Sequence, residues 1–167
     1  SCAPACESDA FEVMSETLTV TEAGAILQNL RITPPAGEPA LLVMADDVSI
    51  ENVVVQTNGA VGIEVFGDDV LIRRANIRHS GTNTPVAGIV LRDTSGARLE
   101  HLSFEGVSQG VRAVDGNGLR VRWARAVDLQ EGNNGLFDCQ GCVDASFEDF
   151  STQNDSSAGA RGMIIAD

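Results

Sequence analysis

The chain has 167 residues, which suits one domain and is enough to bury a core without metal or disulfide support. It carries 24 acidic and 11 basic side chains, so its net charge of -13 should repel nucleic acid and anionic membranes. Every basic residue is an arginine and tyrosine is absent, which excludes catalysis by a lysine or tyrosine base.

Residues 1–24 precede a repetitive region and are expected to cap it. Ser8 or Asp9 is a suitable N-cap for a short helix over residues 8–20, which would cover the first coil. The start of the chain also resembles a bacterial lipoprotein just after its cleavage point. That resemblance implies a lipid on Cys2 and anchoring at the cell surface.

The four cysteines form two close pairs, Cys2 with Cys6 and Cys139 with Cys142. An even count with local spacing favours two small disulfides in an oxidising compartment, as in a secreted or cell-surface protein. A four-thiolate zinc site is the alternative if the two pairs meet in space.

Six short segments of alternating apolar residues, each with a bend, recur along residues 25–167. They begin at Ala25, Val48, Val70, Ala97, Leu119 and Val143. A second strand-like motif lies in each interval, and turn-forming residues separate the segments. One such coil cannot bury its inner face alone, so the coils must stack with parallel strands about 4.8 Å apart. The sequence therefore predicts an all-β fold, a right-handed parallel β-helix of about six coils.

Stacking in register places residues of successive coils in columns. One outward column reads Gln28, Glu51, Arg73, Glu100, Arg122 and Ser146. Its charges alternate in sign, and such vertical pairs favour parallel strands by roughly 0.2 to 1 kcal/mol each. Arg78 is likewise expected to stack on Glu105, whereas Arg74 falls in the bend column, where no acid is offered. The alternative is that Arg73, Arg74 and Arg78 together form a polyanion site, in which Arg74 and Arg78 are the candidate substrate-binding arginines.

The sixth coil departs from this frame. With Val143 as its start, Ala145 continues the inward column that contains Val121. Asp138 and Glu148 then fall at positions where the frame predicts apolar side chains. We expect a bulge or a change of shape in this coil.

The outer face of the second strands breaks the polar-outward rule. Its column is predicted to contain Leu42, Glu64, Val90, Arg112, Phe137 and Ile164. Outward apolar residues imply a cover such as a partner chain or ligand sugar rings, which makes Val90 and Phe137 candidate substrate contacts. Glu64 and Arg112, two coils and about 10 Å apart, are a candidate catalytic pair. The alternative is a structural ion pair or simple surface charges. His79, at the start of a long loop, is a third candidate acid or base.

Aspartates recur at the turns between coils. Asp46, Asp68, Asp93 and Asp115 are expected to crowd one edge, where carboxylate oxygens could hold calcium. The alternative is that they are solvated turn residues, since Asp favours such conformations and "ADDV" at 45–48 returns one coil later as "GDDV".

The pattern over residues 25–167 resembles the β-helix proteins that include pectate lyases, alginate and chondroitin lyases, polygalacturonases and mannuronan epimerases. This resemblance rests on apolar spacing and turn chemistry. It implies an acidic polysaccharide bound along one parallel sheet, with arginine as base and carboxylates, often with calcium, neutralising the sugar acid. "GDDV" at 67–70 resembles the paired aspartates of polygalacturonases, but no Gly-His-Gly or Arg-Ile-Lys element follows it.

Three functions fit these features. The first is a secreted or cell-envelope domain that binds glycans or another surface protein without catalysis. The second is a lyase, hydrolase or epimerase acting on acidic polysaccharide. The third is a structural unit that self-associates end to end, because residues 162–167 stop without a polar cap. The first is favoured, because lysine and tyrosine are absent and stacking neutralises most arginines.

Overall fold

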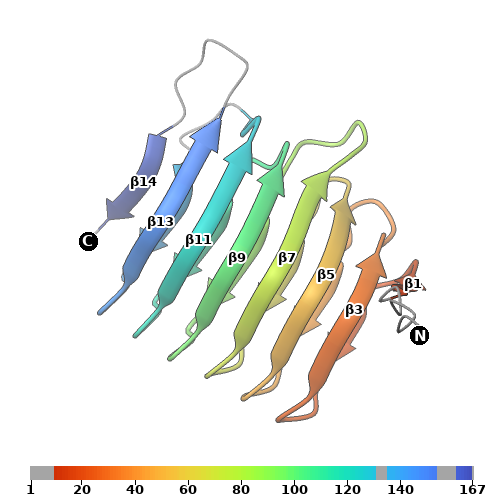
Figure 1. Cartoon of the computed structure of the whole chain (residues 1–167), viewed down its shortest axis with the longest axis horizontal. Coiled ribbons are helices and arrows are strands. Elements are labelled where there is room, and N and C mark those ends of the chain that lie inside the picture. The colour runs from red at the N-terminus through yellow and green to blue at the C-terminus, as the bar shows by residue number, and fades with distance from the viewer. Residues whose placement is uncertain (1–9, 131–134, 154–160, 167) are drawn as a thin grey trace, which may run out of the picture.

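The computed structural model of the chain describes residues 10–130 and 135–153, and the backbone of residues 161–166. In these ranges the chain forms two parallel sheets and no helix. Sheet A contains, in spatial order, β1 (Glu12–Met14), β3 (Ile26–Ile32), β5 (Ser49–Thr57), β7 (Leu71–His79), β9 (Arg98–Glu105), β11 (Arg120–Val127) and β13 (Ser146–Gln153). Sheet B contains β2 (Leu18–Val20), β4 (Leu41–Val43), β6 (Ile63–Val65), β8 (Ile89–Arg92), β10 (Val111–Val114), β12 (Gly135–Gln140) and β14 (Arg161–Ala166). The predicted parallel β-solenoid of about six turns is confirmed (Figure 1).

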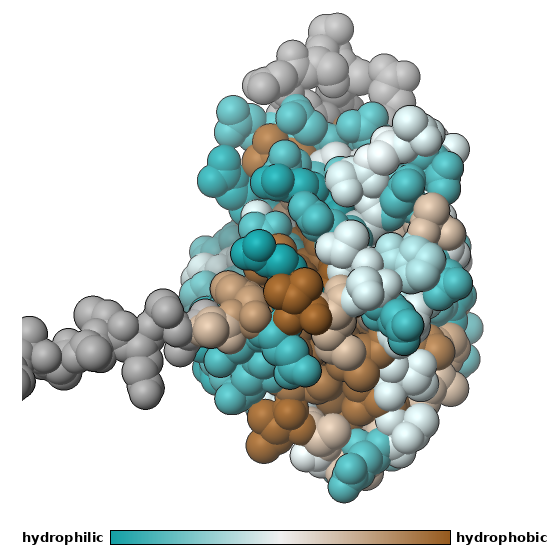
Figure 2. Space-filling view, turned by 90° about the vertical axis from the view of Figure 1, so that its right-hand side faces the viewer, coloured by the Kyte–Doolittle hydropathy of each residue, from teal (hydrophilic) through white to brown (hydrophobic). Residues whose placement is uncertain are grey.

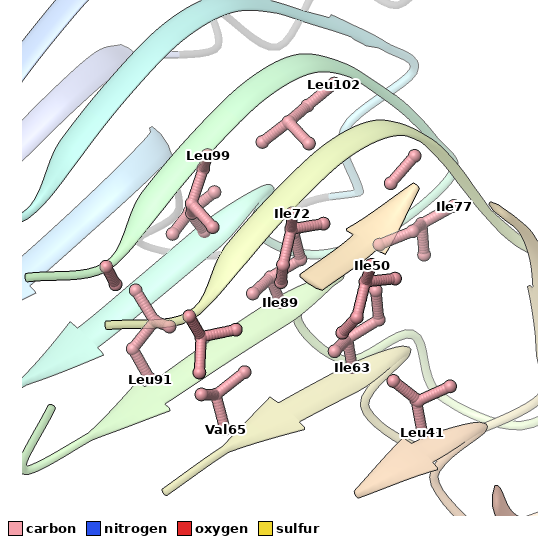
Figure 3. Close-up of a cluster of buried hydrophobic side chains, with 14 of the residues drawn as sticks. Leu41, Ile50, Ile63, Val65, Ile72, Ile77, Ile89, Leu91, Leu99 and Leu102 are labelled. Carbon is pink, nitrogen blue, oxygen red and sulfur yellow. The ribbon is translucent and has the colours of Figure 1, made fainter. Parts of the chain in front are cut away.

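The core lies between the two sheets and follows from the alternation of apolar residues. Ile50, Ile72 and Leu99 of sheet A point toward Ile63 and Ile89 of sheet B, and all five are fully buried (Figure 3). Burying a side chain of this size stabilises a fold by about 1.5 to 3 kcal/mol. Because each inward position is repeated in the next coil, the core is a continuous set of apolar columns along the solenoid.

Two columns of residues with positive φ shape each coil. The corner column contains Gly24, Asp47, Asp69, Gly96, Gly118 and Asp144, and the bend column contains Asn29, Asn52, Arg74, His101, Trp123 and Asp149. Each bend residue follows its corner residue by five positions, so the coils share one frame. The bend divides each long strand of sheet A into two halves. Asn52 Nδ2 donates a hydrogen bond of 2.6 Å to Asn29 Oδ1 across this column.

The first strand of the sixth coil has the same spacing as in the other coils, but its residues are aligned two positions further along the chain than predicted. Val121 pairs with Phe147, not with Ala145, and Arg122 pairs with Glu148. The coil therefore starts at Ala145, directly after the corner residue Asp144. Glu148 accordingly faces outward with its column, so the expected bulge around it is not needed.

The second strand of this coil, β12, also departs from the predicted frame, here by one residue. Val111 pairs with Phe137, and Arg112 pairs with Asp138. Phe137 is therefore inward and fully buried, with its ring 4.6 Å from that of Phe147. The prediction that Phe137 faces outward was wrong, because β12 is shifted by one residue relative to the assumed frame.

The predicted capping helix over residues 8–20 is not formed in its described part. This segment instead supplies β1 and β2, which pair with β3 and β4. Ser8 and Asp9 lie outside the described residues. An isolated helix as short as residues 8–20 is marginal by itself, whereas a sheet edge offers backbone partners at once. Figure 2 shows this end of the solenoid, where apolar residues gather in the middle between less apolar flanks. Val13 in β1 and Ile26 in β3 are exposed.

Candidate functional site

The candidate site residues project from two outer surfaces, which we call wall A, the outward side chains of sheet A, and wall B, those of sheet B. On wall A, Glu51 Oε1 binds Arg74 Nη2 at 2.6 Å and lies 3.4 Å from Arg73 Nε. The expectation that Arg74 meets no acid was therefore wrong, because its guanidinium reaches across the bend to the preceding coil. Arg78 binds Glu105 at 2.7 Å, as predicted. Both candidate substrate-binding arginines are thus neutralised by carboxylates.

A depression opens on wall A before the bend, near the end of the solenoid that carries β13. It is lined by Arg98, Glu100, Arg120, Arg122, Ser146 and Glu148. Arg120 binds Asp144 at 2.9 Å and Arg122 binds Glu148 at 3.0 Å. Arg98 and Glu100 form no ion pair or side-chain hydrogen bond with any other described residue. The depression therefore contains one cation and one anion that are free to bind a ligand.

An exposed pair of rings lies beside this depression at the bend. The His101 and Trp123 rings stack with centroids 4.5 Å apart and planes 13° apart. The Arg122 guanidinium lies 4.9 Å from the Trp123 ring, and Trp123 remains 41% exposed. Rings of this kind pack against the apolar faces of ligands while their polar edges stay in water.

A second depression lies on wall A beyond the bend. It is lined by Arg31, Val54, Gln56, Asn76 and Arg78. Its central column continues through Ser103 and Arg125 to Ser151 and contains no acid. Arg31 lies 5.4 Å from the Phe11 ring and, like Arg125, has no carboxylate partner among the described residues.

Wall B holds the predicted catalytic pair, and the predicted column Glu64, Val90, Arg112 is confirmed. Glu64, however, binds Arg92 at 2.7 Å, and Arg112 Nε lies 3.7 Å from Asp138. Val90 lies between them and is only 3% exposed. Each member of the pair therefore has a different partner within the chain.

His79 does not join this pair. It ends β7 in sheet A and is aligned with the buried Thr57, so it projects toward the interior. Its Nε2 atom is buried and has no hydrogen-bond partner among the residues that the structure describes. Glu64 and Arg112 project outward from the opposite sheet, so the three predicted catalytic residues do not form one site.

The turn aspartates fall into two groups. Asp46 Oδ1 accepts a hydrogen bond from the Asp68 backbone N–H, and Asp68 Oδ1 accepts one from that of Ser95. Asp93 and Asp115 occupy an earlier turn position, because the corners of the later coils are one residue longer. Across the described ranges no three carboxylate, histidine or cysteine side chains converge to hold a metal ion. These aspartates shape the turns.

Cys139 and Cys142 form a disulfide at the corner of the sixth coil. Cys139 is buried beside Ala113, and its bonded sulfur is no longer a thiolate that could bind zinc. The second predicted pair, Cys2 and Cys6, lies outside the described residues.

Comparison with known proteins adds no family to this geometry. No protein-family model matches the chain, and no curated protein matches it. The pectate-lyase-like resemblance therefore has no support beyond the solenoid fold. Within the described residues there is also no helix with the length and apolar character needed to cross a membrane.

The residues that matter most on wall A were not singled out from the sequence. The importance of Arg98 and Glu100 depends on which charges pair in the structure. Asp144 binds Arg120 and Glu148 binds Arg122, so neither arginine binds Glu100. The constant spacing of five residues between corner and bend residues would have revealed these partners, because it determines the alignment of the sixth coil with the fifth.

Proposed function

We propose that this chain is a non-catalytic domain of the cell surface or extracellular space, and that wall A binds a glycan. The observation that carries the proposal is the depression in which Arg98 and Glu100 form no ion pair with another described residue and lie beside the exposed Trp123 ring. A guanidinium and a carboxylate can bind sugar hydroxyls through several hydrogen bonds, and an aromatic ring can cover an apolar sugar face.

The disulfide supports the proposed location. A bond between Cys139 and Cys142 persists where the surroundings are oxidising, outside the cytosol.

The separation of the acid and base candidates supports binding over catalysis. A general acid or base must reach the reacting atom at hydrogen-bond distance. Glu64 and Arg112 are held by Arg92 and Asp138 on one wall, and His79 faces the interior from the other sheet.

Binding to a glycan array, followed by calorimetry with the best ligand, tests the proposal. Arg98→Ala and Trp123→Asn are each expected to weaken binding by about tenfold or more, because they remove a charged hydrogen-bond donor and the ring. Asn already occupies the bend column at Asn29 and Asn52, so Trp123→Asn keeps the backbone conformation. The control is Phe66→Ala on wall B, whose native ring is 40% exposed, and it should bind normally.

Two results would overturn the proposal. The first is unchanged glycan binding by both wall A variants. The second is a rise in ultraviolet absorbance from new double bonds during incubation with uronic-acid polymers, which would identify a polysaccharide lyase.

A further inference from the structure

Wall B carries balanced charges and exposed apolar side chains. Its first outward column is Leu42, Glu64, Val90, Arg112 and Asp138, and its second is Met44, Phe66, Arg92, Val114 and Gln140. The two acids and two bases cancel, although the chain as a whole carries -13. Met44 and Phe66 are exposed. An electrically neutral surface with exposed apolar side chains is where a second copy of a strongly acidic chain can approach.

The charged groups of this wall retain unused hydrogen-bonding capacity. Glu64 uses Oε1 to bind Arg92, and no described side chain donates to its Oε2. Arg112 directs Nε toward Asp138, which leaves both terminal amino groups without a partner in the described part of the chain. A carboxylate oxygen and two guanidinium amino groups are complementary partners.

We propose that wall B is the interface of a face-to-face homodimer, in which the two solenoids run in opposite directions across a two-fold axis at β8. In a two-fold interface the same surface of both copies is in contact. Because the two solenoids run in opposite directions, each column faces the same column of the second copy with its coils in reverse order. Glu64 then faces Arg112 of the second copy, and the contact occurs twice. Phe66 faces Val114 of the second copy. The two Arg92 side chains meet near the axis, each neutralised by its own Glu64.

The other two-fold arrangement, with both solenoids running in the same direction, fits this surface poorly. It exchanges the two columns, so that Glu64 would face Phe66 of the second copy and Arg112 would face Val114. Each charge would lose water without gaining a partner, which is costly. The order of charges along the column therefore selects the opposed arrangement.

The first test compares two exposed rings on opposite walls. Sedimentation equilibrium of the wild-type chain should show a dimer. Phe66→Asp should weaken dimerisation by more than about tenfold, because it places a charge in an apolar contact. Trp123→Asp is the matched control, since Trp123 is 41% and Phe66 40% exposed and Asp149 already occupies the same bend column. Circular dichroism of both variants checks that the fold is retained.

The second test identifies the arrangement. Glu64→Arg alone and Arg112→Glu alone should each be monomeric, since every contact then joins like charges. An equimolar mixture of the two variants should dimerise, because the arginine introduced in one chain faces the glutamate introduced in the other. The remaining contact of that mixed dimer joins the native Arg112 to the native Glu64. If a substitution disturbed the fold of its own chain, that disturbance would persist in the mixture. Dimerisation on mixing therefore shows that residues 64 and 112 of the two chains are in contact.

Three results would overturn the proposal. They are a wild-type chain that stays monomeric at high micromolar concentration, assemblies that grow beyond the dimer, and a mixture that fails to dimerise. Glycan binding by wall A is unaffected by any of these outcomes, so the two proposals fail separately.

Discussion

Single residues with positive φ position every coil of this solenoid. Six different coils place Asn, Asn, Arg, His, Trp and Asp at the bend, all at φ between 53° and 57°. This conformation costs most L-residues about 1 to 2 kcal/mol, whereas Asn and Asp tolerate it. Arg74 and Trp123 are therefore placed against their backbone preference, and His101 less so, because His is enriched in this region. Each of them makes an outward contact, Arg74 with Glu51 and the two rings with each other.

Substitution of Asn52 separates the backbone effect from the side-chain effect. Asn52→Ala should lower the free energy of unfolding by about 2 kcal/mol, because it loses the hydrogen bond to Asn29 and places Ala at φ 54°. Asn52→Gly loses the same hydrogen bond but accepts the conformation, so we expect about half that loss. Urea unfolding measures both values. Equal losses for the two variants would show that the positive φ is not a determinant of stability.

At the scale of elements, the sequence predicts the first five coils well and the sixth poorly. Ile50, Ile72, Leu99 and Val121 occupy the predicted inward column. The pattern failed in "CVDASFEDF", residues 142–150, because the apolar residues Val143, Ala145 and Phe147 alternate with polar ones and can be aligned in more than one frame. In the first five coils the corner is a Gly or Asp followed directly by the first inward residue, as in Asp69-Val70. This rule would have placed the start of the sixth coil at Ala145, after Asp144.

The candidate site was less predictable than the fold. Columns can be derived from spacing, and most charge pairs on wall A follow from them. Diagonal contacts cannot, because the reach of an arginine lets it bind a carboxylate that lies outside its own column. Arg92 binds Glu64 in this way, and Arg120 binds Asp144.

The disulfide stabilises the corner of the last described full coil. Its loop is short, since the two cysteines are three positions apart, and a loop of this size corresponds to about 2 kcal/mol of chain entropy. Replacing both Cys139 and Cys142 by Ser should therefore lower the unfolding free energy by about that amount or more, because a hydroxyl at position 139 is also buried. Amide exchange should increase mainly in β12 and β13, since each coil contacts only its neighbours. Uniform exchange changes in all coils would contradict this.

At the scale of the whole molecule, the ion pairs between described residues join one coil to the next and do not lie within a single coil. All seven ion pairs between described residues join neighbouring coils. Surface pairs of this kind contribute about 0 to 1 kcal/mol each. Their main effect is to disfavour other alignments of the coils, in which like charges would be neighbours. The net charge of -13 is compatible with this ordered stacking because the arginines are placed where the coils meet.

The same stacking produces the two walls and their different properties. Wall A combines paired charges, arginines that have no acidic partner in the described ranges, and an exposed ring, which suits a polar ligand. Wall B is neutral and partly apolar, which suits a second protein surface. Both surfaces depend on one alignment of all six coils, including the shifted sixth coil.

The most direct test of that alignment is a nuclear Overhauser measurement on the inward column. Methyl contacts should connect Ile50 with Ile72, Ile72 with Leu99 and Leu99 with Val121, and the Val121 methyls should contact the Phe147 ring. Stronger contact of Val121 with the Ala145 methyl than with the Phe147 ring, or absence of the Ile72 to Leu99 contact, would contradict the account.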